Sequence, residues 1–177
     1  MIIIALILIL SIIVLTSSIY RDRITFITIK LNNVEEKINS TLLERKELIK
    51  DSEKIIKEVT KTDKEVFNGL NDLDSTNPGM MELDRKLLVY INEFYLIKNK
   101  YGKLENNNDF KKIVFKINET EDVLNAYKDY YNDYASKYNK LIRRFPIIII
   151  SLIKRRKEKD FFDKKNLSDN DYNDFKY

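Results

Sequence analysis

The first nineteen residues, Met1 to Ile19, carry no charged side chain, and this block restricts the fold more than any other stretch. Its residues are mainly Ile, Leu and Val, interrupted by a few Ser and Thr. Because a helix rises about 1.5 Å per residue, the block would span roughly 28 Å, close to the hydrocarbon thickness of a bilayer. We therefore predict that residues 1–20 form a transmembrane helix.

The charges after this block favour one orientation in the membrane. Arg21 and Arg23 follow it directly, and basic residues beside a membrane helix favour the cytoplasmic side. A secretory signal peptide would carry basic residues before its apolar run, and none stands there. We therefore expect an uncleaved, single-pass anchor with a cytoplasmic domain. Cleavage near the small side chains of residues 16–18 is the competing interpretation, and it would place the domain in the cell envelope.

The remainder of the chain is predicted to form long helices. The 177 residues include only 3 Gly and 2 Pro, which are the residues that turns consume. Apolar side chains recur every three or four positions from residue 24 to residue 73, a pattern that predicts one helix about 75 Å long. Pro78 and Gly79 then end this helix, because neither continues it well.

Two further helices are predicted after this turn, over residues 80–101 and 110–145. The later one has the cleanest apolar seam in the chain, with Thr120 as its only polar position. Helices with such seams bury one another as a bundle. We therefore predict an all-α fold, in which the N-terminal transmembrane helix is followed by an antiparallel bundle of long helices over residues 21–163. Residues 164–177 are polar and are predicted to be a disordered tail.

Part of the first helix's seam lacks a cover, because that helix is more than twice as long as the next one. Three arrangements would leave no seam exposed. The helix breaks, residues 147–162 fold back over it, or a second copy of the chain covers it. The sequence leaves these three open. The return segment is also the strongest interaction candidate, through Ile147, Ile150, Lys154, Arg155, Arg156 and Lys157.

Residues 147–159 allow two interpretations. An apolar stretch followed by a basic cluster binds an acidic membrane leaflet or the groove of a partner protein. The alternative is a capping helix, whose Ile side chains complete the bundle core while the Lys and Arg side chains are solvated. The stretch is too short to span a bilayer itself.

A buried polar layer is predicted inside the bundle. Arg45 falls on the seam of the first helix, Thr120 falls on that of the third, and Glu121 directly follows Thr120. Our hypothesis is that Arg45 bonds Glu121, because such a pair fixes the register of two helices. The alternative is that Arg45 lies at the edge of the seam and extends its charge into water.

Asparagines recur every seven residues along the third predicted helix, at Asn118, Asn125, Asn132 and Asn139. Seven residues are close to two helical turns, so these side chains lie in one line beside the seam. We interpret them as structural residues that form hydrogen bonds between helices. Recognition of a partner helix is the functional alternative.

The composition excludes several chemistries. With no His and no Cys, the usual zinc sites, the His- or Cys-dependent triads and disulfides cannot be built. The Gly residues are isolated from one another, which excludes a phosphate-binding loop. The net charge of +4 is spread along the chain, so nucleic acid is not an expected partner. We predict no enzymatic activity, no metal and no cofactor.

Several short motifs resemble the LemA family of bacterial membrane proteins. They are Thr120-Glu121, Tyr131-Asn132, Tyr138-Asn139 and Phe145-Pro146, together with Asp160-Phe161-Phe162 near the end of the chain. The resemblance covers about residues 31–162. It implies a membrane-anchored, antiparallel helical domain in a bacterium, and the family has no agreed biochemical activity to carry over. Lys50 and Gly102 depart from the family pattern, which has Pro at both positions.

These observations predict a protein of the LemA type without enzymatic activity, anchored in a bacterial inner membrane. It would act as a scaffold that binds other proteins at the cytoplasmic surface. The protein partner is unidentified, and a second copy of the chain is a further candidate. The alternative function is that of a peripheral lipid-binding module that uses residues 147–159.

Overall fold

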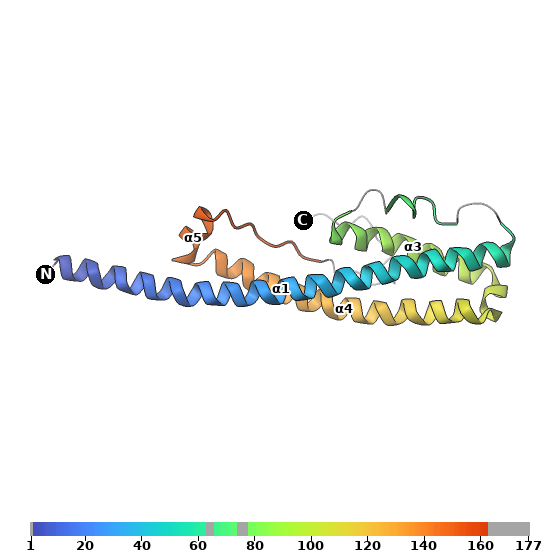
Figure 1. Ribbon diagram of the computed structural model, residues 1–177, viewed down its shortest axis with the longest axis horizontal. Helices are drawn as coiled ribbons and strands as arrows, with labels where there is room; N and C mark the ends of the chain where they lie inside the picture. Colours follow the sequence, from blue (N-terminus) through green and yellow to red (C-terminus); the bar gives the residue numbers. More distant parts are fainter. Residues whose placement is uncertain (1, 63–65, 74–77, 163–177) are drawn as a thin grey trace. The chain divides into compact units, whose positions relative to one another are not determined.

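The structure is a computed structural model that describes residues 2–62, 66–73 and 78–162, without the side chains of residues 2, 5, 6, 9 and 10. Within these residues the long elements are α1 (Ile2–Thr60), α3 (Met80–Lys100) and α4 (Asn108–Ile142), as Figure 1 shows. The short elements are the 3-10 helix η1 (Gly102–Asn106) and α5 (Ile147–Ile153). The described residues contain no strand, so the all-α prediction is confirmed. The predicted tail, residues 164–177, lies outside the described residues.

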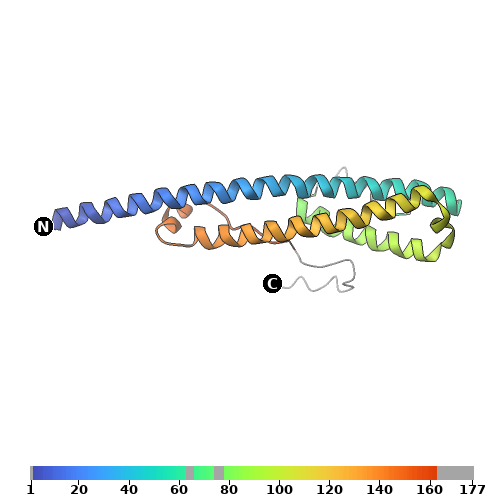
Figure 2. The same cartoon turned by 90° about the horizontal axis from the view of Figure 1, so that it is seen from below.

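The described residues form two compact units, and α1 and α4 contribute to both. The first unit comprises the chain as far as Glu36 together with Lys128–Phe162, and the second comprises Lys37–Tyr127. Within each unit, α1 and α4 run side by side in opposite directions (Figures 1 and 2). The prediction of antiparallel helices is therefore confirmed for each unit.

The core of the second unit lies between α1, α3 and the first half of α4. Its fully buried side chains come from the predicted seams of all three helices. Among them are Ile38, Leu42, Ile49, Ile56, Leu87, Ile91, Phe94, Ile117 and Leu124. The rings of Phe94 and Phe110 stack with their centroids 5.1 Å apart, which joins α3 to the first turn of α4. This apolar core holds the three helices together.

The start of α4 is fixed by a side-chain cap. The Oδ1 atom of Asn107 accepts hydrogen bonds from the backbone N–H groups of Asp109 and Phe110, both at 2.9 Å. An Asn cap satisfies backbone donors that a helix start leaves without partners inside the helix. The connection from α3 therefore ends at a defined residue, and Phe110 is turned into the core.

The prediction of one helix from residue 24 to residue 73 is wrong, because α1 ends at Thr60. Lys61 has a φ of 55°, which leaves the right-handed helical region. The chain then turns back, so that Phe67 and Leu70 are fully buried. The carboxylate of Glu53 on α1 accepts the N–H of Val66 at 3.0 Å and fixes this return. The burial of these two large apolar side chains stabilises the returned segment.

The core of the first unit lies between the first half of α1 and the second half of α4. Its buried side chains include two residues that follow α4 in the chain, Ile147 and Phe162. The other members are Ile24, Leu31, Val34, Tyr131, Ala135, Tyr138, Leu141 and Ile142. Two of the three alternatives for the long first seam are therefore present. Residues 147–162 fold back onto the first unit, and the helix ends at Thr60.

Residues 2–20 of the predicted anchor belong to the N-terminal part of α1. Large aliphatic side chains of this part are exposed, among them Ile3 at 72% and Leu15 at 65%. Within the part of the chain that the structure describes, no helix combines the length and the apolar character needed to cross a membrane.

Candidate functional site

The structure brings Arg45 and Glu121 together in the second unit. Arg45 is fully buried, and its Nη2 group donates a hydrogen bond to Oε2 of Glu121, with which it forms an ion pair. The other carboxylate oxygen, Oε1, accepts the side-chain amide of Asn125 at 3.1 Å. The alternative, in which Arg45 reaches water at the edge of the seam, is wrong, because none of its side chain is exposed.

The third predicted member of this layer does not join the pair. Thr120 is buried, but its hydroxyl donates to the carbonyl of Ile117 on its own helix, at 2.9 Å. Among the described residues, no hydrogen-bond partner is found for Nε and Nη1 of Arg45. The positive charge of Arg45 therefore depends on the carboxylate of Glu121 for its compensation.

Two asparagines of the first unit bind the backbone of the returning segment, residues 156–162, which we call the C-terminal strap. The side-chain amide of Asn139 donates to the carbonyl of Lys159 and its Oδ1 accepts the N–H of the same residue, both at 2.8 Å. Asn132 makes the same two bonds with Phe162, again at 2.8 Å. Each amide thus pairs with one residue's backbone as a neighbouring strand would.

The spacings of the two partners match. Asn132 and Asn139 are seven residues apart on α4, which is about 10.5 Å along the helix. Lys159 and Phe162 are three residues apart, and three residues span at most about 11 Å when fully extended. The strap must therefore be nearly extended to reach both asparagines. The seven-residue spacing of Asn132 and Asn139 therefore matches an extended chain, whereas Asn118 of the same row bonds Tyr95 on α3.

Side chains reinforce this attachment. The ring of Phe162 meets that of Tyr131 edge to face, with the centroids 5.1 Å apart, and Nζ of Lys128 lies 6.0 Å from the Phe162 ring centre. Lys159 forms an ion pair of 2.9 Å with Glu35 of α1. The strap is therefore held by α1 and α4 together.

Loss of the asparagine amides is expected to loosen the strap. In the variant Asn132→Ala/Asn139→Ala, the amides of Lys159 and Phe162 should exchange with deuterium about tenfold faster or more, since each lost bond contributes about 0.5–1.5 kcal/mol. Hydrogen exchange with mass spectrometry measures this rate. The control is Asn118→Ala, an asparagine of the same row whose Oδ1 accepts the Tyr95 hydroxyl. Equal strap exchange in both variants would contradict the assignment.

The Tyr131 hydroxyl provides a test of the same region by pH. Burial, assisted by the carboxylates of Glu35 and Asp160, raises the pKa of Tyr131 to about 12. The unfolded value is about 10, so the folded chain holds this proton more tightly and loses stability as the pH rises from about 10 to about 12. Tyr131→Phe should reduce this alkaline loss, measured by denaturant titrations across that range. Tyr101→Phe, at an exposed tyrosine, should leave it unchanged.

The structure separates the predicted interaction residues after Pro146 into those that line a cavity and those that do not. Ile147 is buried in the core of the first unit, while Leu152 and Ile153 are 72% and 77% exposed, so α5 caps the core only in part. A cavity of about 440 Å³ lies between α5 and the N-terminal part of α1. Its lining contains four of the predicted residues, Ile147, Ile150, Lys154 and Arg156. Arg155 and Lys157 are not among the residues that line it.

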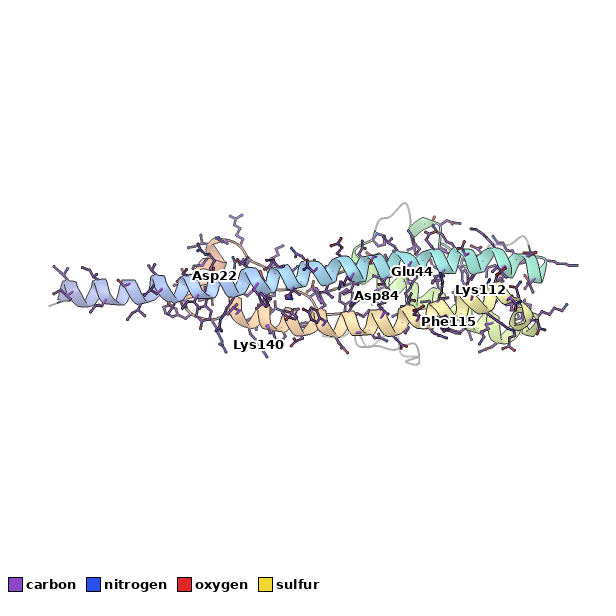
Figure 3. The ribbon with its side chains drawn as sticks, turned by 60° about the horizontal axis from the view of Figure 1, so that its bottom comes forward. Asp22, Glu44, Asp84, Lys112, Phe115 and Lys140 are labelled. Carbon is purple, nitrogen blue, oxygen red and sulfur yellow. The ribbon has the colours of Figure 1, made fainter. Side chains whose placement is uncertain are left out.

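Sequence reasoning missed several buried polar residues, including Glu53, Asp84 and Lys128. Figure 3 labels Asp84 on α3 and Phe115 on α4. Asp84 is 4% exposed although it is acidic, and Phe115 is 69% exposed although it is apolar. A single acidic or apolar residue does not disturb the apolar spacing of a helix, so the sequence pattern does not reveal the burial of Asp84 or the exposure of Phe115. Across residues 2–62, 66–73 and 78–162, no group of three or more acidic side chains is placed to hold a metal ion.

Comparison with known proteins gives one match. A family model described as the LemA family matches residues 30–173, which is most of the chain. This range includes the ion pair, the asparagine row and the C-terminal strap. No curated protein and no solved structure matches the chain.

Proposed function

Because the chain belongs to the LemA family, we propose that it is a membrane-anchored scaffold without enzymatic activity at the cytoplasmic surface of a bacterial inner membrane. Residues 1–20 are the proposed anchor, and the helical bundle over residues 21–163 is the proposed binding domain. The observation that carries the proposal is the contrast along α1. Its N-terminal part is apolar and exposed, whereas its later part buries a regular seam.

The anchor is supported by the side chains of the N-terminal part of α1. Ile3, Ile7 and Ile12 are 72%, 58% and 60% exposed, and no charge occurs before Arg21. Exposed apolar surface of this extent is costly in water and favourable in lipid. The basic residues Arg21 and Arg23 support the cytoplasmic orientation.

The scaffold role is supported by the surface of the second unit. The large apolar side chains that its helices expose include Leu96 on α3 and Phe115 on α4, each 69% exposed. Residues of this kind are found at protein contacts. The composition supports the absence of catalysis, since His and Cys, the commonest bases and nucleophiles, are missing.

Two experiments test this proposal on the full chain in native membranes. Alkaline carbonate should leave the protein in the membrane pellet, and its release into the supernatant would contradict the anchor. A photo-crosslinking amino acid at Leu96 or Phe115 should give a protein adduct of defined mass, whereas one at Lys140 of the first unit should not. Adducts with lipid alone would contradict the scaffold role.

A peripheral lipid-binding module is the second candidate function, and one observation favours it. Leu152 and Ile153 are exposed at the end of α5 and are followed directly by a basic run that begins at Lys154. Exposed apolar side chains next to basic ones are typical of segments that bind an anionic membrane surface.

A further inference from the structure

The cavity beside α5 has a lining that changes character along α1. Along α1 the lining runs from Ile13 and Val14 to Arg21, and an apolar residue, Ile24, follows. Ile13 and Arg21 are separated by about 12 Å of helix rise. α5 contributes two further apolar residues, Ile147 and Ile150. The cavity lining therefore combines apolar residues of α1 and α5 with the first basic residue of the chain, Arg21.

The charged side chains that line the cavity are all positive. Lys154 and Arg156 line it together with Arg21, and none of the described lining residues is acidic. Ser17 and Ser18 also line it, and hydroxyl groups can donate hydrogen bonds to phosphate or ester oxygens. A ligand that matches this lining has an apolar tail, a polar middle and an anionic head.

The two basic residues beyond α5 are positioned by the backbone. After the helix the N–H of Lys154 bonds the carbonyl of Ile150 and the N–H of Arg156 bonds that of Ser151, both at 2.9 Å. Arg155 between them has a φ of 48°, so the chain turns sharply there. Lys154 and Arg156 line the cavity as a consequence, and Arg155 does not.

We propose that this cavity binds one anionic glycerophospholipid, with its phosphate at Arg21, Lys154 and Arg156 and an acyl chain along Ile13 and Val14. The inference rests on the proposed membrane anchor, which places this part of α1 at the boundary between hydrocarbon and headgroups. A volume of about 440 Å³ holds the phosphoglycerol group and the first part of a chain. The remaining acyl carbons stay in the bilayer.

The chain offers a matched pair of variants for the test, because lining and non-lining basic residues alternate. Lys154→Ala/Arg156→Ala and Arg155→Ala/Lys157→Ala remove the same charge from the same six-residue stretch. The full chain in detergent is mixed with phosphatidylglycerol or phosphatidylcholine, and bound lipid is counted by native mass spectrometry. We expect the first variant to lose about tenfold in affinity for phosphatidylglycerol and the second to stay within about twofold.

Equal losses in the two variants would overturn the proposal, since binding would then follow net charge alone. Equal binding of phosphatidylcholine by the unchanged protein would also overturn it. A third variant, Ile150→Trp, fills the cavity without changing charge, and it should lower phosphatidylglycerol binding while the helical circular dichroism signal is retained.

Carbonate extraction of the same variants separates this inference from the proposed function. Retention of the unchanged protein in the membrane without preference for phosphatidylglycerol would reject the lipid site and leave the anchor intact. Release of the unchanged protein would reject the anchor, and the lipid site with it.

Discussion

Glu121→Ala is expected to destabilise the second unit by about 3–5 kcal/mol, because it removes the counter-charge of a buried arginine. Arg45 is fully buried, and within the described residues two of its three guanidinium nitrogens have no hydrogen-bond partner. Without Glu121 the positive charge remains in an apolar core with little compensation. A titration with denaturant, followed by circular dichroism, measures the change.

The same titration, applied to a double variant, separates the interaction energy of the ion pair from the individual contributions of Arg45 and Glu121. Arg45→Met combined with Glu121→Gln removes both charges, and its cost should be much smaller than the sum of the two single costs. Glu44→Gln provides the control, because Glu44 lies on α1 next to Arg45 with its side chain exposed (Figure 3), and we expect a change within about 0.5 kcal/mol. Simple addition of the two single effects would show that the ion pair has no energetic role.

Phe94→Ala is expected to cost about 3–5 kcal/mol, the second large effect. Phe94 is fully buried, stacks on Phe110 and meets Tyr95 edge to face at 5.3 Å. Its removal leaves a cavity where α3 contacts the beginning of α4, and the capped start of α4 cannot move to fill it. Denaturant titration again gives the value.

A control for this variant lies two residues further along the same helix. Leu96→Ala removes a large apolar side chain that is 69% exposed, so it should change stability by about 0.5 kcal/mol or less. Phe94→Leu keeps most of the volume and should cost less than Phe94→Ala. Equal effects of Phe94→Ala and Leu96→Ala would mean that the core is not where the structure places it.

Much of the helical fold could be predicted from periodicity. The seam from Phe110 onward has an apolar residue on nearly every turn, and α4 follows it. The end of α1 at Thr60 was missed because the apolar pattern continues through residues 66–73. What ends the helix is tertiary: the buried Phe67 and the bond from Val66 to Glu53. Neither has a local signature in the sequence.

The candidate sites were predictable to different degrees. Arg45 and Glu121 were found because a charge on an apolar seam needs a partner. The asparagine row was noticed, but the partner of Asn132 and Asn139 is a backbone, and a backbone has no sequence pattern to match. The row was expected to join helices, and in the first unit it holds an extended strap instead.

The cavity was beyond the reach of sequence reasoning. Its walls come from α1 and α5, which are more than one hundred residues apart in the chain. Lys154 and Arg156 were singled out together with Arg155 and Lys157, because a basic run does not reveal which of its members face the same way. The turn at Arg155 makes that separation.

The most direct test of the central claim, that the beginning of α1 lies in lipid, is the collision of spin labels with two relaxing agents. The chain has no Cys, so a labelled cysteine at Ile12 or Phe26 has no background. The two positions are 60% and 55% exposed on the same helix. In liposomes, the label at Ile12 should meet oxygen often and a water-soluble nickel chelate rarely, and the label at Phe26 should show the reverse. Equal access of the nickel chelate to both labels would contradict the membrane anchor.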